Sequence, residues 1–475
     1  MARQEIQYAG EFRLLLCQLV TVTGNTFDIS ELVEQIDIYE DIYKATISGS
    51  ILIKDTTNLV YNLPILGEER LLLYIETPQS NPTPETTIDY RENPLMIYKI
   101  NMKEKGNESS ELISLQFGSI EGLRNSSCRV SQSYKGRPSE IVEKIIRDET
   151  YLKSAKKIHK EETANLIKII FPNKRPFDCI QHLTNISNSQ NHGDSPTYLF
   201  YETTKGFHYV TFDGLSSMSP KMYYREHTPM VNETGAFDIQ ATMESILRYQ
   251  LISSKDTIKN IYSGMLSSKL IAHDVYNKKV NTHKFDYLSN FKNDTYPDGN
   301  ESFPIVSLAK DPETNLMLTE HEDTRMFVSS TSGGYAFSDK VEGGDDIYPY
   351  QSDNLEKTLQ RKTSRLLQMT GGVVLNVEVN GNTSMQVGDK IHLTIESNST
   401  LTGDAKDTNL DLTGNYIITR LKHKFVRTGI LKHTIVMQVT KFNTRREYPA
   451  GGISNVGKGV EQPASPHVHL PLVDF

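Results

Sequence analysis

Apolar and polar side chains alternate in the first third of the chain. Between residues 34 and 55 the apolar positions include Ile36, Ile38 and Ile51, with polar residues between them. A period of two is typical of strands with one buried and one solvated face. Gly49 interrupts this pattern and indicates a bulge or a close backbone approach. Together with further strands predicted at 70–77, 94–103 and 111–119, the pattern predicts a small antiparallel β-barrel or sandwich.

Apolar residues then recur every three or four positions. Pro138 opens one predicted helix and Pro176 a second, because proline is tolerated in the first helical turn. Two apolar runs at 197–202 and 207–213 predict a hairpin. Residues 240–265 again have helical spacing and are predicted to be helical, through Ile246, Leu247, Leu251, Ile258, Ile261 and Met265.

The remainder of the chain divides into an irregular stretch, a second β region and a tail. Residues 290–352 have no periodicity and are rich in Asp, Asn, Gly, Ser and Pro. A helix is predicted from Asp353 to the pair Gly371-Gly372. Asn380-Gly381 predicts a hairpin turn. The strands in this region are predicted at 373–379, 390–396, 415–425 and 431–441, and the stretch 449–475, rich in Pro and Gly, is expected to need a partner to become ordered.

The predicted fold class is α+β, mainly β, with two small antiparallel β-barrel domains and with helical and irregular insertions between them. A length of 475 residues allows several domains. From the N-terminus, the expected segments are the first barrel domain 1–130, an α/β middle domain with helices and a hairpin 131–235, a helical connecting segment 236–289, the irregular insertion 290–352, a helix with the second barrel domain 353–445, and an extended Pro/Gly-rich tail 446–475.

Charge and cysteine content exclude some classes of protein. The chain has 51 Lys and Arg against 59 Asp and Glu, a net charge of −8, whereas binding to nucleic acid normally needs a basic surplus. Cys17, Cys128 and Cys179 are odd in number and far apart, so they fit neither a disulfide framework nor a zinc site. We interpret them as small apolar fillers, with a Cys–His dyad as the alternative. The sequence has no signal-peptide layout and no apolar run of about 18 residues, so no membrane span is expected.

No catalytic motif is present in the sequence. The run His159-Lys160-Glu161-Glu162 lacks the second His of a zinc motif, and His321-Glu322-Asp323 has no spaced partners. We therefore assign no catalytic, cofactor-binding or metal-binding residue, and predict neither a cofactor nor an enzymatic activity. His467 and His469 leave one alternative open, because in an extended tail both face the same way and a trimer would gather six imidazoles. A polar break in the tail is the simpler interpretation.

Short segments spread over residues 30–440 carry a family resemblance. They are QIDIYEDI at 35–42, GSILIKD at 49–55, LPILGEE at 63–69, PNKRPF at 172–177, GFHY at 206–209, SGM at 263–265, LIAHD at 270–274, FDY at 285–287, VGD at 387–389 and LTGNYII at 412–418, with His423 and Phe425 after them. In this order they resemble the baseplate central hub proteins of T4-like contractile-tailed bacteriophages, a tail hub family related to the hub portion of type VI secretion spike proteins.

The resemblance implies a homotrimer in which each subunit contributes two similar barrels, so that three subunits form a ring of six. This ring would adapt the three-fold central spike to the six-fold tail tube. The implied partners are the spike protein, the tail tube or a tube-initiator protein, the tape-measure protein and baseplate wedge subunits. The implied location is the virion baseplate, assembled in the bacterial host cytoplasm. DNA would pass through the lumen without sequence-specific binding, and an acidic or neutral lumen would keep phosphates from adhering.

Within this resemblance, residues 43–47 and 415–419 are predicted to be equivalent strands of the two barrels, although the sequence shows no residue-level repeat. The tail from Pro449 is expected to reach the spike or a neighbouring baseplate subunit. Alternatives are the hub part of a contractile injection or type VI secretion spike, a baseplate-associated cell-wall hydrolase, and a carbohydrate-binding β protein. The hydrolase would need a larger ordered domain than 290–352 supplies, and the absence of Trp argues against the carbohydrate binder.

Overall fold

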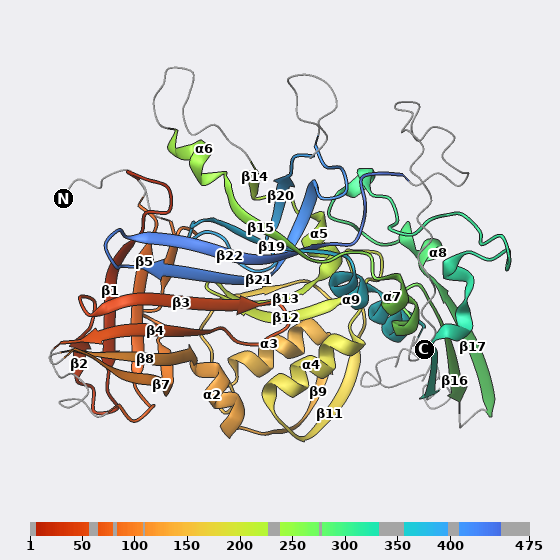
Figure 1. Ribbon diagram of the computed structural model, residues 1–475. Helices are drawn as coiled ribbons and strands as arrows, with labels where there is room; N and C mark the ends of the chain where they lie inside the picture. Colours follow the sequence, from red (N-terminus) through yellow and green to blue (C-terminus); the bar gives the residue numbers. More distant parts are fainter. Residues whose placement is uncertain are drawn as a thin grey trace, which may run out of the picture.

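The computed structural model describes residues 6–56, 65–78, 83–107, 110–226, 238–274, 278–331, 356–397 and 408–447. The predicted class, α+β and mainly β, is confirmed, since one large sheet and three smaller ones dominate and helices gather near the middle of the molecule (Figure 1). Among the described strands, no sheet closes on itself into a barrel. The two predicted β regions instead share the large sheet.

The first β unit contains eight strands and has its own hydrophobic core, which includes Ile36, Ile51, Leu115 and Phe117. Gly49 is a close approach, as predicted, because a Cβ at this position would overlap the Phe117 ring. The strands pair in the order β3-β4-β8-β7-β5-β1-β2, with β6 beside β5. Their bounds are β1 Arg13–Val20, β2 Thr26–Asp28, β3 Val33–Asp41, β4 Ser48–Asp55, β5 Arg70–Glu76, β6 Thr87–Asp89, β7 Leu95–Asn107 and β8 Ser110–Ser119.

The middle unit is an α/β layer around a third core that α3, α4, β12 and β13 share. Both predicted helices are present, each with its proline in the first turn, and the predicted hairpin is confirmed as β12–β13. The elements are α2 Ile120–Ser127, β9 Val130–Gly136, α3 Pro138–Arg147, β10 Ile158–Lys160, β11 Ile167–Lys174, α4 Pro176–Ile186, β12 Tyr198–Thr203, β13 Gly206–Thr211 and α5 Phe212–Ser217.

The second β unit is formed by β14 Met222–Arg225, β15 Ile246–Ser253, β19 Val373–Asn380, β20 Lys390–Thr394, β21 Gly414–Val426 and β22 Lys432–Lys441. The predicted helix over 240–265 is wrong, since only α6 (Ile239–Met243) and α7 (Thr257–Ser263) are helical there. Between them, β15 pairs antiparallel with β19 and places Tyr249 and Leu251 opposite Val377 and Leu375. Tertiary strand pairing has overridden the helical spacing.

The predicted hairpin at Asn380-Gly381 is also wrong. The strand before this turn, β19, pairs with β15 and β22, whereas the next strand, β20, pairs with β14 and β21. Gly381 serves packing instead: a Cβ at this position would overlap the His433 ring, and its backbone N–H donates to the His433 carbonyl at 2.9 Å. The glycine therefore permits a close approach between chain segments rather than a two-residue turn.

The chain segment between β15 and β19 forms a separate small sheet. It consists of β16 Ser267–Asp274, β17 Lys279–Asp286 and β18 Met326–Thr331, with α8 Tyr287–Phe291 and the short 3-10 turns Gly299–Glu301, Leu318–Glu320 and Glu322–Thr324. The predicted irregular insertion thus contains a strand, and its residues 332–352 lie outside the described residues. The helix predicted from 353 is seen as a π-helical turn, Glu356–Arg361, followed by α9 Lys362–Gly371. The tail from 448, with His467 and His469, also lies outside the described part.

The two β units join edge to edge. β3 of the first unit pairs antiparallel with β21 of the second, from Asp41 opposite Arg420 to Gln35 opposite Val426. We call this pairing the seam. It makes one continuous row of eight strands in the order β15-β19-β22-β21-β3-β4-β8-β7, which lie above one another in Figure 1. The seam thus connects chain segments from near the two ends of the sequence.

Candidate functional site

The two β units repeat one four-strand arrangement. In chain order the strands are β3, β4, β7 and β8 in the first unit and β15, β19, β21 and β22 in the second. Within the sheet both sets follow the order first, second, fourth, third. The third strand has 13 residues and the fourth has 10 in both units. The units are therefore structural duplicates, which the sequence did not reveal.

Bulges recur at the same places in the two units. Where the first strand pairs with the second, an extra residue follows Val33 in β3 and Ile246 in β15. Where the third strand pairs with the fourth, an extra residue follows Ile97 in β7 and Ile418 in β21. Bulges change the twist and aim of a strand and are structural features of a fold rather than defects. Their recurrence fixes the alignment of the two units residue by residue.

This alignment is consistent across every strand pair. Gln116 in β8 lies opposite Ser50 in the second strand and Lys99 in the third. Gln438 in β22 lies opposite Asn376 and Arg420 in the corresponding strands of the other unit, so Gln116 and Gln438 are equivalent. β7 has two further bulges, after Ile100 and after Lys105, and β15 has one further bulge, after Leu251. Counting through these pairings, the equivalent positions include Ile36 and Tyr249, Asp37 and Gln250, Ile38 and Leu251, Leu421 and Ile100, His423 and Lys103, and Lys424 and Glu104. The predicted equivalence of 43–47 with 415–419 is wrong, because 43–47 lie between β3 and β4 outside any strand.

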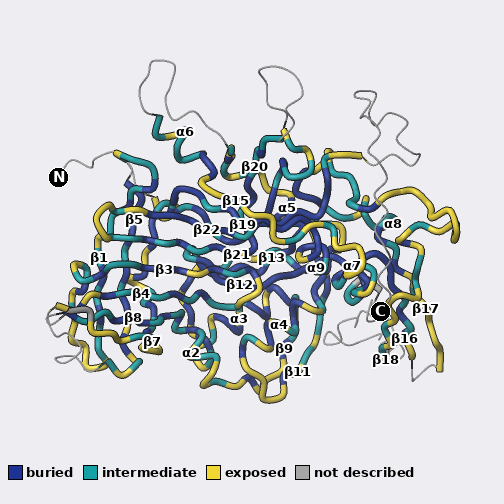
Figure 2. The backbone as a smooth tube through the Cα atoms, viewed as in Figure 1, coloured by how far each residue is buried: buried dark blue, intermediate teal, exposed yellow. Residues whose placement is uncertain are grey.

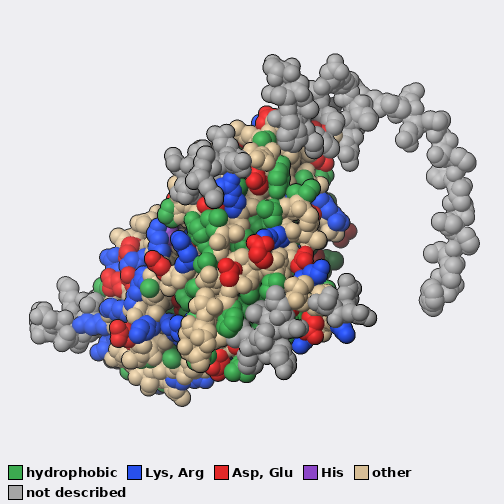
Figure 3. Space-filling model, turned by 90° about the vertical axis from the view of Figure 1, so that its left-hand side faces the viewer, with side chains coloured by type: hydrophobic (Ala, Val, Ile, Leu, Met, Phe, Trp, Pro, Cys, Tyr) green, Lys and Arg blue, Asp and Glu red, His purple; other side chains and the backbone are tan. Residues whose placement is uncertain are grey.

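One face of the eight-strand row is polar and the other packs on the two β cores. A cross-strand row of polar side chains runs from Lys424 through Asp37 and Ser50 to Gln116. The charged residues of this polar face have both signs, with Lys54, Arg420, Lys422 and Lys424 against Asp37, Asp41 and Glu378. Acidic and basic side chains are also interspersed at the end of the molecule that Figure 3 shows. The polar face is therefore not acidic, although the whole chain is.

The seam is closed on both of its faces. On the polar face, Lys422 Nζ lies 2.9 Å from Asp37 Oδ2, and Arg420 Nε lies 3.3 Å from Asp41 Oδ2. On the core side, the Phe425 ring is buried and meets another buried ring of the first unit, with centroids 5.1 Å apart. Ion pairs and aromatic packing thus support the strand pairing between the units.

Glu40 connects the seam to two further segments. Its carboxylate is buried, and Oε1 accepts a hydrogen bond from the Thr204 N–H at 2.6 Å, in the β12–β13 turn. Oε2 accepts from the Val387 N–H at 2.8 Å, in the second β unit. Burial raises the pKa of Glu40 to about 7, and the two N–H donors oppose this rise. One side chain therefore holds the first, middle and second units together.

A second buried carboxylate joins the first and middle units. Lys156 Nζ lies 2.6 Å from Glu202 Oε1 and 2.7 Å from Glu121 Oε2, with all three side chains buried. Glu202 Oε2 also accepts from the Ile47 N–H at 3.1 Å. Burial raises the pKa of Glu202, while the Lys156 charge lowers it. Such a paired and hydrogen-bonded cluster fixes one relative placement of the two units and has no open side for a substrate.

The two outer edges of the eight-strand row are open. Among the described residues, β15 pairs only with β19, and β7 beyond Met96 pairs only with β8. Both edges expose large apolar side chains, Tyr98 and Ile100 on β7 and Leu251 and Ile252 on β15. Exposed stretches run along both strands in Figure 2. Unpaired strand edges with exposed apolar residues are surfaces on which another chain can add a strand.

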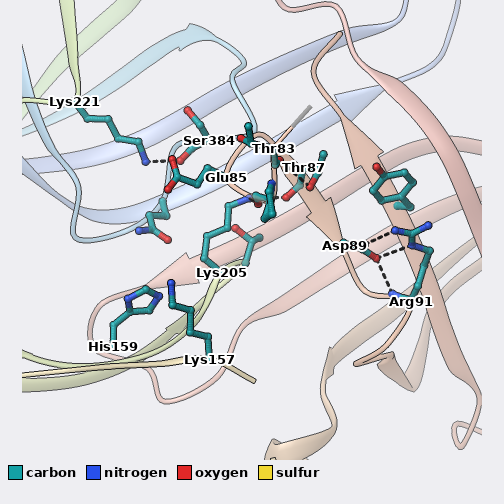
Figure 4. Close-up of a pocket in the computed structure, with 14 residues that line it drawn as sticks. Thr83, Glu85, Thr87, Asp89, Arg91, Lys157, His159, Lys205, Lys221 and Ser384 are labelled. Atoms are coloured by element: carbon teal, nitrogen blue, oxygen red, sulfur yellow. Dashed lines mark hydrogen bonds and ion pairs between the residues drawn. The ribbon is translucent and has the colours of Figure 1, made fainter. Parts of the chain in front are cut away.

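A polar pocket of about 560 Å³ opens where the three units meet (Figure 4). Lys205 Nζ donates to the Pro84 and Thr87 carbonyls at 3.2 and 2.5 Å, and Lys221 Nζ lies 2.8 Å from Asp389. Burial lowers the pKa of Lys205 to about 8. The lining residues are Tyr74, Thr83, Pro84, Glu85, Thr87, Asp89, Arg91, Lys157, His159, Thr204, Lys205, Lys221, Ser384 and Gln386.

The candidate metal residues of the sequence are engaged in other contacts. Glu322 pairs with Lys284 at 2.5 Å and Asp323 with Lys269 at 3.1 Å, so the cluster around His321 is a set of surface ion pairs. Within the described ranges, no group of three or more His, Cys, Asp or Glu side chains is arranged to hold a metal ion. These residues therefore give no geometric support for a metal centre.

The cysteines and the histidine motif are separate from one another. Cys17 and Cys179 belong to two different hydrophobic cores, and Cys128 Sγ contacts the Tyr151 carbonyl oxygen at 3.6 Å. Burial raises the pKa of the Cys179 thiol to about 11, which disfavours the reactive thiolate. The His159 ring stacks on another histidine ring, with centroids 4.6 Å apart. None of these groups forms a dyad in the structure's described part.

The residues alone showed no repeat, so two similar units were expected only from the family resemblance, and the seam and the open edges were not predicted. The alternating pattern identified strands, but pairing between β3 and β21 is set by contacts across almost the whole chain. In the described part of the chain, no helix is both long and apolar enough to cross a membrane.

The fold of this chain is similar to that of several solved tail proteins. No protein-family model and no curated protein sequence matches the chain. Among solved structures, the tail protein from Neisseria meningitidis MC58 matches 90% of this chain and 96% of its own, with 14% identity and a TM-score of 0.50. The 43 kDa tail protein of prophage MuSo2 from Shewanella oneidensis matches 90% and 98%, with 9% identity and a TM-score of 0.49. A component of the E. coli type VI secretion system, described as similar to T4 tail proteins gp27 and gp5, matches 92% and 78% with 9% identity and a TM-score of 0.34. The resemblance seen in the sequence is confirmed at the level of the fold, and the chain has the fold of a tail protein.

Proposed function

We propose that the chain is a structural subunit of a phage tail baseplate, a homotrimeric hub that adapts the three-fold central spike to the six-fold tail tube. The internal duplication carries this proposal. Each chain supplies two matching four-strand units in one sheet, so three chains around an axis present six such units. A six-fold partner can then dock on equivalent surfaces, while the remaining, unduplicated parts keep three-fold symmetry for the spike.

The polar face supports a channel role. A sheet with one face on a hydrophobic core and one polar face suits a ring wall whose inner surface meets water. Its charges are of both signs, and its acidic residues Asp37 and Asp41 already pair with Lys422 and Arg420. DNA and a tape-measure protein would therefore pass a polar surface of mixed charge. Such a surface has no large field of one sign that would hold either of them.

The remaining assignments follow from the hub. The partners would be the spike protein, the tube or tube-initiator protein and baseplate wedge subunits, and the location would be the virion, after assembly in the host cytoplasm. The chain would act without catalysis. The buried clusters around Glu40 and Glu202 then serve to hold the units rigid under load, because each ties neighbouring units through buried hydrogen bonds.

Light scattering on the purified chain, alone and mixed with the spike and tube proteins of the same tail, tests the proposal. The expected mass is three times 53.8 kDa, about 161 kDa, with further mass added by each partner. A chain that stays at 53.8 kDa at every concentration and with both partners present contradicts the hub. A peptidoglycan zymogram provides the enzymatic control, and a clearing band from the pure chain would favour a hydrolase.

A further inference from the structure

The open edges are formed by the same two strands of the four-strand unit as the seam. The seam pairs the third strand of one unit, β21, with the first strand of the other, β3. The edges left open are the third strand of the first unit, β7, and the first strand of the second unit, β15. The directions also agree, because the eight strands of the row alternate and β7 is antiparallel to β15.

Equivalent side chains differ in exposure at the seam and at the open edges. Ile38 in β3 is fully buried, with 0% of its surface exposed, whereas its equivalent Leu251 in β15 is 46% exposed. Leu421 in β21 is 2% exposed, whereas its equivalent Ile100 in β7 is 38% exposed. All four are apolar and on the core side of the sheet. The open edges thus keep the side chains of a buried seam while lacking the strand that would cover them.

We propose that β7 of one copy pairs antiparallel with β15 of the next copy in the register of the seam, so that Glu104 lies opposite Gln250 and Lys103 opposite Leu251. The register follows from the alignment of the units, since Lys424 opposite Asp37 and His423 opposite Ile38 are the equivalent pairs of the seam. The inference rests on the proposed homotrimer and names the surface that builds it.

A second copy of the chain fits these edges better than an unrelated partner. The contact joins two different edges, so each copy uses its β7 edge toward one neighbour and its β15 edge toward the other. Such an assembly closes into a ring when a whole number of copies completes a full turn. Pairing β7 with β7, or β15 with β15, would leave the other edge open and would not repeat the seam. Closure removes both exposed edges at once, which is a general solution to the hazard of unpaired strands.

Engineered disulfides test the register. In a Cys128→Ser background, the double variant Glu104→Cys/Gln250→Cys, which we call the matched pair, places two thiols directly opposite each other between copies, where Cβ atoms lie about 4.5–5.5 Å apart. Mild oxidation should then convert most of the chain into covalent dimers and trimers on a non-reducing gel. The seam variant Lys424→Cys/Asp37→Cys is the control within one chain, and should lose its thiols without any gain in mass.

Two further kinds of variant complete the experiment. The mismatched pair, Glu104→Cys/Leu251→Cys, puts the thiols on opposite faces of the strands, because successive side chains alternate, and should give little cross-linking. Each single cysteine variant should also stay uncross-linked. A second test replaces Leu251 by Lys at the edge and should shift the mass from trimer to monomer while leaving the melting curve cooperative.

The outcomes separate this inference from the hub itself. Trimers by light scattering with no cross-link in the matched pair, or with equal cross-linking of the mismatched pair, would overturn the proposed edges and leave the hub standing. A chain that is monomeric with and without its partners would overturn both. Trimers in which only the matched pair cross-links establish the edge pairing.

Discussion

The seam and the open edges are one kind of strand edge in two situations. At the seam, β3 and β21 meet within the chain, with Ile38 and Leu421 buried and with Lys422 paired to Asp37. At the open edges, the outer sides of β15 and of β7 beyond Met96 pair with no strand within the described ranges, and apolar side chains there are partly exposed. These side chains are therefore exposed because a partner strand is missing and not because the positions are polar.

The comparison also separates stability from assembly. Side chains at the seam are part of the folded chain, so their loss should lower the free energy of unfolding of the chain itself. Side chains at the open edges contribute little to that free energy, and their loss should act on association between copies. Substitutions at equivalent positions can therefore distinguish the two roles directly.

The largest effect is expected from Phe425→Ala at the seam. The Phe425 ring is buried in the core of the first β unit and stacks on His433, with centroids 4.1 Å apart. Its removal should destabilise the chain by about 3–5 kcal/mol through lost burial and a cavity. Urea unfolding measures the change. A loss below about 1 kcal/mol would show that the seam is not a packed part of the fold.

The pH dependence of stability tests the Glu40 junction. Its pKa is raised from 4.5 to about 7, so the folded chain holds this proton more tightly than the unfolded chain does. The associated stability is fully present below pH 4.5 and is lost as the pH rises through about 7, and it amounts to about 3 kcal/mol. Unfolding followed from pH 4.5 to 8 should show this slope, and Glu40→Gln should flatten it. An unchanged slope in the variant would assign the titration to another group.

A smaller loss is expected from Lys422→Met. The variant leaves Asp37 without its ion pair on a nearly buried side chain, and about 1–2 kcal/mol should be lost. The matched control is Lys424→Met, because Lys424 lies opposite Asp37 in the strand pairing while the ion pair with Asp37 is formed by Lys422. Equal stabilities of the two variants in urea would mean that the ion pair contributes nothing to the seam.

The smallest change in stability is expected from Ile100→Ser on the open edge. Because this side chain is partly exposed, the free energy of unfolding of the separate chain should change by no more than about 0.5 kcal/mol. The same variant should weaken the association between copies, which dilution followed by light scattering measures. Marked destabilisation together with unaltered association would reverse the roles assigned to seam and edge.

The sequence predicted local elements better than their arrangement. Alternation around Ile36 and Ile51 and the prolines at 138 and 176 led to correct strands and helices, because these signals depend on neighbouring residues. β15 was predicted as a helix, since Ile246 and Leu247 have helical spacing with Leu251, and only pairing with β19 makes it a strand. Local pattern cannot anticipate a partner that lies more than a hundred residues away.

The candidate site was not predictable for a related reason. The duplicated units share strand order and bulge positions, whereas equivalent residues such as Asp37 and Gln250, or Lys424 and Glu104, share only polar character. A repeat in pairing geometry leaves little trace in residue identity. The family resemblance supplied the expectation of two similar units, but it placed their equivalence at 43–47, outside any strand.

End-on electron micrographs of the purified assembly test most directly whether duplicated units alternate around a ring. We expect class averages with three-fold symmetry and six similar lobes around a central opening, in which lobes of the first and second β units alternate. Averages with three lobes, or with two unlike lobes from a single chain, would contradict it.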